Sequence, residues 1–352
     1  MAPNESCCEA EGGASARAQS FSVVQPPEQS VPLVFASPHS GHDYPMQFVA
    51  ASRLRPLLLR RSEDAFVDCI FAAAPSLGAP LLRAHFPRVY LDPNREPFEL
   101  DPSMFDTPLP DYVNAGSPRV AAGLGTIARV VANGEEVYRG KLSFAEARQR
   151  IHAHYFPYHR ALQNLLQSTR QRFGCYLLVD CHSMPSVGGP MDADPGLKRL
   201  DIVLGDCYGT ACAPAVTRLA ERTLRDLGFT VRRNLPYAGG YTTRHYGRPR
   251  DGLHALQIEM NRALYMDEES IVPTSGLRSV IAAITTLVGA LSTLGPESLK
   301  PAGVEPGRGP LPGHPSPKKG PYMTAQVLGG NVQEARATHI GDRRVLHRTT
   351  NR

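Results

Sequence analysis

Two apolar runs in the sequence each lead into a histidine followed by a serine. Residues 32–36 precede Ser-Pro-His-Ser, which contains His39, and residues 176–179 precede Asp-Cys-His-Ser, which contains His182. Short apolar runs of this kind are typical of buried strands, and ligands of open α/β sheets lie just beyond the carboxyl ends of strands. The pattern therefore predicts that His39 and His182 meet at one edge of a sheet. The alternative is that each histidine only caps its own strand.

Two histidines at a sheet edge suggest a metal centre. Catalytic zinc takes three protein ligands from His, Asp, Glu and Cys and keeps a fourth position open for water. Four residues are candidates for the third ligand, and the spacing does not choose among them. They are Glu63, Asp64, Asp68 and His42. An acidic pair in an interrupted helix is also typical of a solvated turn. Asp180, two residues before His182, could instead accept a hydrogen bond from the ring nitrogen of a ligand histidine that does not bind the metal.

Glu259 ends another apolar run, residues 255–260. A carboxylate buried there is costly unless it is paired or functional. Beside an activated water it would act as a general base and then as a proton donor to a leaving nitrogen. The alternative is a structural salt bridge to Arg262.

Several arginines and polar residues lie next to predicted strand ends. Arg88 precedes the Asn94-Arg95 pair, and the glycine-rich stretch 239–247 carries Tyr241 and Arg244. Arginine is suited to bidentate recognition of carboxylates, so this set predicts a small substrate with two carboxylates. Each arginine could also have a structural role.

Other catalytic motifs are missing from the sequence. It contains no phosphate-binding loop of the Walker type and no dinucleotide-binding glycine motif followed by a helix. Ser40 and Ser183 do not lie in a nucleophile elbow. We therefore do not expect nucleotide chemistry or a serine nucleophile.

Strand and helix patterns alternate along the chain. We expect strands at 32–36, 80–84, 89–91, 176–180, 200–204, 230–234 and 255–260. We expect helices at 52–74, with a joint near its middle, and at 143–173, 213–227 and 275–294, and loops at 96–140 and 235–252. Ser143 and Glu146 have the spacing of a capping box, and Pro157 predicts a kink. This alternation predicts an α/β fold with a mixed, mainly parallel central sheet and helices on both faces.

The composition of the 352 residues limits the class of protein. Hydrophobic residues make up 42%, no stretch approaches the ~20 apolar residues of a membrane span, and Met1–Ser20 lacks the apolar core of a secretory signal. The net charge of +5 is spread out, which does not predict nucleic-acid binding. Seven scattered cysteines fit free thiols in the cytoplasm. We expect tails without structure at 1–28 and 296–352 around one catalytic domain at 29–295.

Taken together, several motifs resemble those of the N-formylglutamate amidohydrolase family. They are SPHSG (37–41), SEDAFVD (62–68), PRVYLDPNR (87–95), PYH (157–159), VDCHS (179–183), GGYTTRHYGRP (239–249) and HALQIEMNRALYMDE (254–268). The resemblance covers roughly residues 30–295. It implies a fold like that of the zinc carboxypeptidases (phosphorylase/hydrolase-like) and one Zn²⁺ per chain.

The resemblance also implies a role for each candidate residue. The wider carboxypeptidase and aspartoacylase group has a Glu three places after the first His, where this chain has His42, so the resemblance carries the middle ligand to Asp64. The implied metal ligands are His39, Asp64 and His182, the implied general base is Glu259, and the implied substrate-binding residues are Arg88, Asn94, Arg95, Tyr241 and Arg244.

The expected reaction is hydrolysis of an N-acyl amino acid, with N-formyl-L-glutamate giving formate and L-glutamate as in histidine degradation. A zinc deacylase or carboxypeptidase with another acidic substrate is the alternative among enzymes. A metal-free binding protein for acidic amino acids is the alternative outside enzymes, and His39, His182 and Glu259 argue against it. We expect no nucleic-acid or membrane partner, and the sequence leaves the oligomeric state open.

Overall fold

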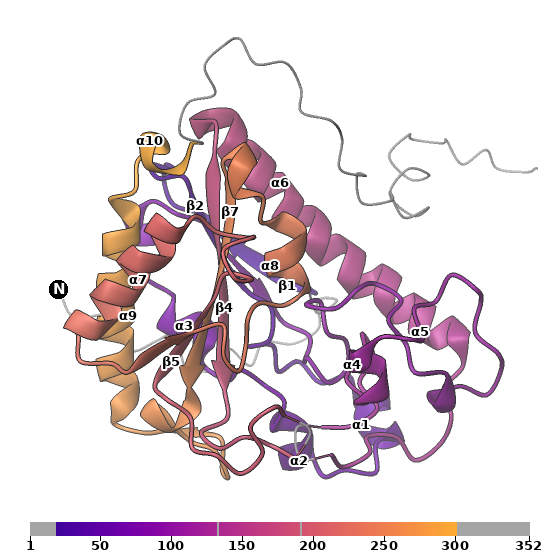
Figure 1. The fold of residues 1–352 in the computed structure, drawn as a ribbon. Coiled ribbons are helices and arrows are strands. Elements are labelled where there is room, and N and C mark those ends of the chain that lie inside the picture. The colour runs from indigo at the N-terminus through magenta and orange to yellow at the C-terminus, as the bar shows by residue number, and fades with distance from the viewer. Residues whose placement is uncertain (1–18, 132–133, 191, 301–352) are drawn as a thin grey trace, which may run out of the picture. The chain divides into compact units, whose positions relative to one another are not determined.

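One mixed sheet carries His182 and Glu259 and leads directly into His39. The computed structural model describes residues 19–131, 134–190 and 192–300. In this part of the chain, seven strands form a sheet with the order β1-β3-β2-β4-β7-β5-β6 (Figure 1). The strands are β1 (Phe21–Val24), β2 (Leu33–Ser37), β3 (Leu81–Ala84), β4 (Tyr176–Met184), β5 (Ile202–Gly205), β6 (Val231–Arg233) and β7 (Leu253–Asn261). A separate pair joins β8 (Met266–Asp267) to β9 (Val272–Pro273).

The central strands of the sheet run parallel. β3, β2, β4 and β7 are parallel neighbours. β1 is antiparallel to β3, and β5 is antiparallel to β7 but parallel to β6. The prediction of a mixed, mainly parallel sheet is therefore confirmed, and the carboxyl ends of β2, β4 and β7 lie at the same edge.

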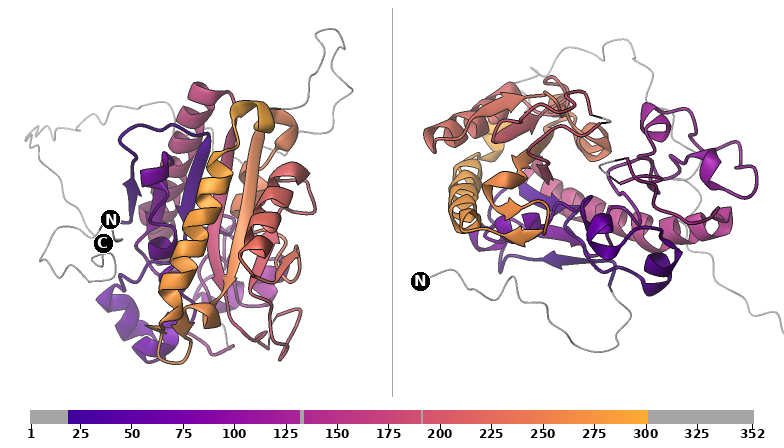
Figure 2. Two further views of the ribbon diagram at one scale, coloured as in Figure 1. Left: turned by 90° about the vertical axis from the view of Figure 1, so that its left-hand side faces the viewer. Right: turned by 90° about the horizontal axis from the view of Figure 1, so that it is seen from below.

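Helices cover both faces of the sheet, as Figures 1 and 2 show. One face packs on α3 (Val67–Ile70), α7 (Pro214–Asp226) and α9 (Gly276–Ser292), and the other packs on α6 (Phe156–Phe173) and α8 (Tyr241–Tyr246). The shorter helices are α1 (Met46–Ala51), α2 (Pro56–Arg60), α4 (Pro118–Ala121), α5 (Phe144–Arg150) and α10 (Pro296–Leu299). No helix among the described residues is long and apolar enough to cross a membrane.

The alternation of side chains along β4 determines where the site forms. Leu177, Val179 and Cys181 belong to the core under α7 and α9, whereas Tyr176 and Leu178 belong to the core under α6. Because successive side chains of a strand point to opposite faces, Asp180 and His182 continue the α6 face. Gln257 and Glu259 do the same on β7, after Leu253 and Ala255. The apolar core thus gives way to polar side chains toward the carboxyl ends of both strands.

The long helical stretch contains an irregular turn. Ser143 accepts a hydrogen bond from the backbone N–H of Glu146 and caps α5, which is one of the two contacts of the predicted capping box. The side chain of Glu146 pairs with Arg150 instead. A π-helical turn, Ile151–Tyr155, follows and leads into α6. Pro157 lies in the first turn of α6. Proline cannot donate to the carbonyl four residues earlier, so the break predicted near it is confirmed, and it takes the form of a π turn.

Several predicted boundaries are wrong. The expected strand at 89–91 is a turn, because the backbone of Tyr90 donates to Pro87 O over 2.9 Å. The expected loop 235–252 contains α8, and β4 runs past residue 180 to Met184.

The predicted tails also begin at different positions. β1 lies within the expected N-terminal tail, since its backbone pairs with β3 from Phe21↔Ala84 to Val24↔Leu81. α10 lies within the expected C-terminal tail. The remainder of those two predictions, residues 1–18 and 301–352, lies outside the described residues.

Candidate active site

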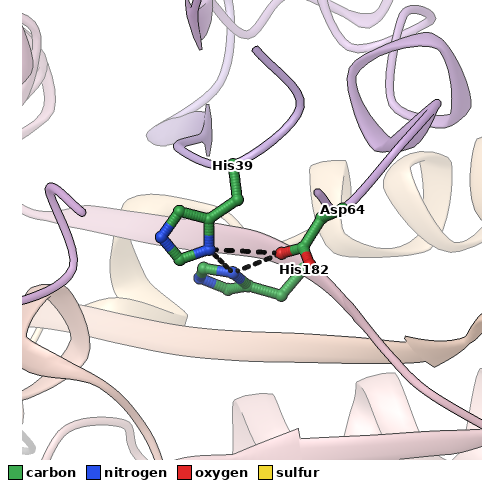
Figure 3. Close-up of side chains that lie close together, drawn as sticks. All are labelled: His39, Asp64 and His182. Atoms are coloured by element: carbon green, nitrogen blue, oxygen red, sulfur yellow. Dashed lines mark hydrogen bonds and ion pairs between the residues drawn. The ribbon is translucent and has the colours of Figure 1, made fainter. Parts of the chain in front are cut away.

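His39, Asp64 and His182 bring three potential metal ligands together (Figure 3). His39 Nδ1 lies 3.1 Å from His182 Nδ1, and Asp64 Oδ2 lies 3.3 Å from the first nitrogen and 3.0 Å from the second. Ligand atoms at usual bond lengths around tetrahedral zinc are about 3.3 Å apart. All three side chains are buried. Their chemistry and spacing therefore fit a zinc-like metal ion with one position left open.

A second carboxylate lies behind each histidine. His39 Nε2 is 2.8 Å from Asp92 Oδ1, and His182 Nε2 is 3.0 Å from Asp180 Oδ1. A carboxylate can only accept, so the hydrogen bond to Asp92 places the ring proton of His39 on Nε2. The approach of Asp180 favours the same tautomer of His182, and each Nδ1 is then free to bind a metal. Asp180 is fully buried, and neither of its carboxylate oxygens has a hydrogen-bond partner among the described residues. Its approach to His182 agrees with the supporting role that the sequence suggested for Asp180.

Backbone and side-chain contacts fix Asp64 next to the histidines. Its backbone N–H donates to His39 O over 3.0 Å, and Arg262 Nη2 donates to its Oδ1 over 2.9 Å. Burial alone would raise the pKa of Asp64. The close imidazoles of His182 and His39, with the charge of Arg262, instead hold that pKa well below its usual value. Asp64 is therefore a carboxylate, the form that binds a metal.

The other candidates for the middle ligand have different partners. Glu63 is buried but accepts hydrogen bonds from Tyr44 and Arg60. Asp68 lies 3.9 Å from Arg83, and His42 lies 3.3 Å from Ser40 O. The geometry therefore favours Asp64 over these alternatives.

Glu259 lies directly opposite His182 in the β4–β7 register. Its Oε1 accepts a hydrogen bond from Gln257 Nε2 over 2.9 Å. Burial raises the pKa of Glu259 to about 8, while the charges of His182, Arg88 and Arg262 oppose that rise. Arg262 contacts Asp64, Ser183 and Arg61 O. The carboxylate of Glu259 is thus available for proton transfer rather than held in a salt bridge to Arg262.

A cavity of about 370 Å³ opens beside these groups. His39, His182 and Glu259 line it, together with five arginines, namely Arg88, Arg95, Arg119, Arg244 and Arg262. Arg88 donates to Asp92 over 3.0 Å, and Arg95 donates to Leu124 O and Asn94 O. Neither Arg119 nor Arg244 has a carboxylate partner among the described residues. The cavity therefore offers unpaired positive charge to an anionic ligand.

Two tyrosines differ from what the sequence suggested. Tyr241 is absent from the cavity lining, since its ring packs on His159 and stacks on His245 at 4.9 Å. Tyr237 lines the cavity instead, and the guanidinium of Arg199 lies 5.0 Å from its ring centre. Tyr237 lies in the expected loop 235–252, before the glycine-rich stretch 239–247, and no motif pointed to it.

Asn94 connects the cavity wall to α8. Its Oδ1 accepts the backbone N–H of Thr242 over 2.8 Å, and its Nδ2 lies 3.3 Å from His182 Nε2. A Cβ on Gly240 would lie 2.3 Å from Asn94 Nδ2, so this approach requires glycine. Asn94 is therefore buried as a structural link to the first turn of α8.

His159 lies behind the Asn94-Arg95 segment and is neutral at pH 7, because burial lowers its pKa to about 4. An unfolded histidine titrates near 6.5, so below that pH the unfolded chain binds a proton that the folded chain does not. The contribution of His159 to the free energy of unfolding is therefore fully present above pH 6.5 and is lost as the pH falls toward 4.

We therefore expect acid to destabilise the wild type more than His159→Gln. Between pH 7 and pH 4.5 the free energy of unfolding of the wild type should fall by about 2 to 3 kcal/mol more than that of the variant. Urea unfolding at both values measures this. His152→Gln is the control, because His152 is an exposed histidine of the same helical stretch. A difference between wild type and His159→Gln that does not change with pH would contradict the prediction.

The fold and this group of side chains define a hydrolase with a candidate metal centre. Residues 31–266 match the family model for N-formylglutamate amidohydrolase, and the chain belongs to that family.

Proteins named as N-formylglutamate deformylases or amidohydrolases are similar to this chain. The chain is 33% identical to an N-formylglutamate deformylase of Pseudomonas aeruginosa, over 68% of this chain and 84% of the relative. It is 28% identical to an N-formylglutamate deformylase of Pseudomonas putida, over 68% of this chain and 83% of that relative. The crystal structure of an N-formylglutamate amidohydrolase from Ralstonia eutropha JMP134 superposes with a TM-score of 0.72 at 37% identity, over 78% of this chain and 97% of that chain. The family predicted from the motifs is thus confirmed.

Proposed function

We propose that this protein is a zinc-dependent deformylase that converts N-formyl-L-glutamate and water into formate and L-glutamate. The observation that carries the proposal is the His39–Asp64–His182 group, placed beside Glu259 in a cavity lined by arginines. Both N-formylglutamate deformylases to which the chain is similar support the choice of substrate.

His39, Asp64 and His182 would hold the zinc ion. Bound there, it would polarise the amide carbonyl, activate a water molecule and lower the pKa of the neighbouring Glu259. Glu259 accepts a proton from the attacking water on one carboxylate oxygen. It then delivers that proton to the amide nitrogen as the C–N bond breaks, so that formate and the free amine leave.

The arginines bind and orient the substrate. Arg95 is held by two backbone carbonyls and by an approach of 3.5 Å to Asp92. A guanidinium has five N–H donors, so about two remain for one substrate carboxylate. Arg119 and Arg244 are available for the other. Burial of the two arginine-bound carboxylates would fix the amide bond relative to Glu259.

The test of this function is formate release from a panel of N-acyl amino acids, paired with metal analysis of the same preparation. We expect N-formylglutamate to be hydrolysed fastest, activity to disappear on chelation, and zinc to restore it. Full activity in a metal-free preparation would disprove the zinc requirement. Faster release from a substrate with a different acyl group would identify a related deacylase instead.

A substrate that lacks the side-chain carboxylate should be hydrolysed with a lower kcat/KM. N-Formylglutamine should show a kcat/KM about ten- to a hundredfold below that of N-formylglutamate, because a charge-assisted hydrogen bond contributes about 1.5–3 kcal/mol. Arg244→Gln should reduce this preference if Arg244 binds that carboxylate, and Arg119→Gln tests the other unpaired arginine.

Arg248→Gln is the matched control for these variants. Arg248 follows α8 closely and lies 3.6 Å from Asp251, outside the cavity lining. It should keep the preference of the wild type. Equal rates of the wild type on both substrates would show that the side-chain carboxylate is not recognised.

A further inference from the structure

The π turn before α6 places a buried tyrosine against the cavity wall. Tyr155 is the last residue of that turn, and its hydroxyl donates to Arg95 O over 2.7 Å. A π turn adds a residue to the helical repeat and is frequently found at functional sites. In this chain it aims a side chain at the segment that carries Arg95.

One turn later, His159 holds the same segment at a second point. Its Nε2 lies 2.8 Å from Pro93 O and its Nδ1 lies 2.9 Å from the hydroxyl of Tyr246. A carbonyl only accepts, so Nε2 carries the proton, and Tyr246 donates to Nδ1. The Tyr155 and His159 rings are 4.3 Å apart. Each ring therefore restrains the other.

These two contacts enclose Asn94 and Arg95. The carbonyl before Asn94 is bound by His159, and the carbonyl of Arg95 is bound by Tyr155. The backbone N–H of Asn94 donates to Asp92 Oδ1 over 2.8 Å. The two-residue segment is thus fixed from α6, from Asp92 and, through Thr242, from α8.

We propose that Tyr155 and His159 are positioning residues, which set the place of Arg95 in the cavity by binding the carbonyls on either side of Asn94. Neither one lines the cavity, so they act on substrate binding only through that segment. The inference rests on the proposed function, in which Arg95 binds a substrate carboxylate.

The test uses Tyr155→Phe, which removes only a hydroxyl, on the metal-loaded full chain. We expect KM for N-formylglutamate to rise about three- to tenfold, the value of one neutral hydrogen bond, while kcat changes less than twofold. Two amide analogues of the substrate, N-formylglutamine and N-formylisoglutamine, each lack one carboxylate. With the analogue that lacks the carboxylate bound by Arg95, the rise in KM should disappear.

His159 gives a second, independent variant. The side-chain amide of His159→Gln can still donate toward Pro93 O, whereas His159→Leu cannot. We expect KM of the Leu variant to rise about three- to tenfold and KM of the Gln variant to stay closer to the wild-type value.

Tyr176→Phe is the matched control. Tyr176 is buried like Tyr155, and its hydroxyl donates to a backbone carbonyl, Tyr246 O, over 2.8 Å. The Tyr176→Phe substitution should lower Tm about as much as Tyr155→Phe does, and it should leave KM unchanged. The inference is overturned if Tyr155→Phe lowers Tm but leaves KM unchanged, or if its KM effect is equal on all three substrates. Failure of the proposed function is distinguishable, because the wild type itself would then not hydrolyse N-formylglutamate.

Discussion

Replacement of Glu259 by glutamine should lower turnover of N-formylglutamate by about 10² to 10⁴, the usual range for loss of a general base. The amide has nearly the same size as the carboxyl group, and its oxygen can still accept the hydrogen bond from Gln257. Fold, zinc content and substrate affinity should therefore be retained, since other side chains provide them. Turnover, zinc content and affinity are to be measured on one preparation.

Two results would contradict this role of Glu259. Near-normal turnover would remove it from the mechanism. Loss of zinc from Glu259→Gln would show that Glu259 is itself a ligand, and the assignment of Asp64 would then be wrong.

Replacement of Asp64 by asparagine should weaken zinc binding by more than about 100-fold. Changes to the partners of metal ligands already weaken affinity about 10- to 100-fold, and Asp64 contributes the only carboxylate of the three-residue group. The same change also leaves Arg262 without its buried ion pair, so a lower Tm is expected. Zinc affinity is measured by competition with a chelator at a temperature where circular dichroism shows the variant to be folded.

Glu63→Gln is the matched control for Asp64. Glu63 is the neighbouring acidic residue and is also buried, but its partners are Tyr44 and Arg60. It should lose stability without losing zinc. The reverse outcome, with zinc lost from Glu63→Gln and kept by Asp64→Asn, would make Glu63 the middle ligand.

The strands of the site could be predicted because their signal is local. The apolar runs before His39 and His182 mark β2 and β4, and parallel strands bring their carboxyl ends to one edge. Glu259 became a candidate in the same way, because it ends the apolar run of β7, and the structure then places it opposite His182. The sequence alone therefore suffices to make these three residues candidates.

The remainder of the site depends on contacts between distant segments. Asp64 is placed by its bond to His39 O, which no local pattern encodes, so it could only be chosen among neighbours by family resemblance. α8 was predicted as a loop because the contact that holds its first turn is not local. That turn is bound by Asn94, which is 148 residues away in sequence. The contact of Asp92 with His39 was missed for the same reason.

The distances along the chain between site residues have a consequence for folding kinetics. His39 and His182 are 143 residues apart, and Asp64 and Arg262 are 198 residues apart. Contacts of such high sequence separation form late, because the entropy of loop closure opposes them. Zinc would then find its ligands only after the central strands have paired. A ligand at a concentration of 1,000 times its Kd adds roughly 4 kcal/mol to the free energy of unfolding. For zinc, this gain should therefore appear almost entirely as slower unfolding, with the folding rate unchanged.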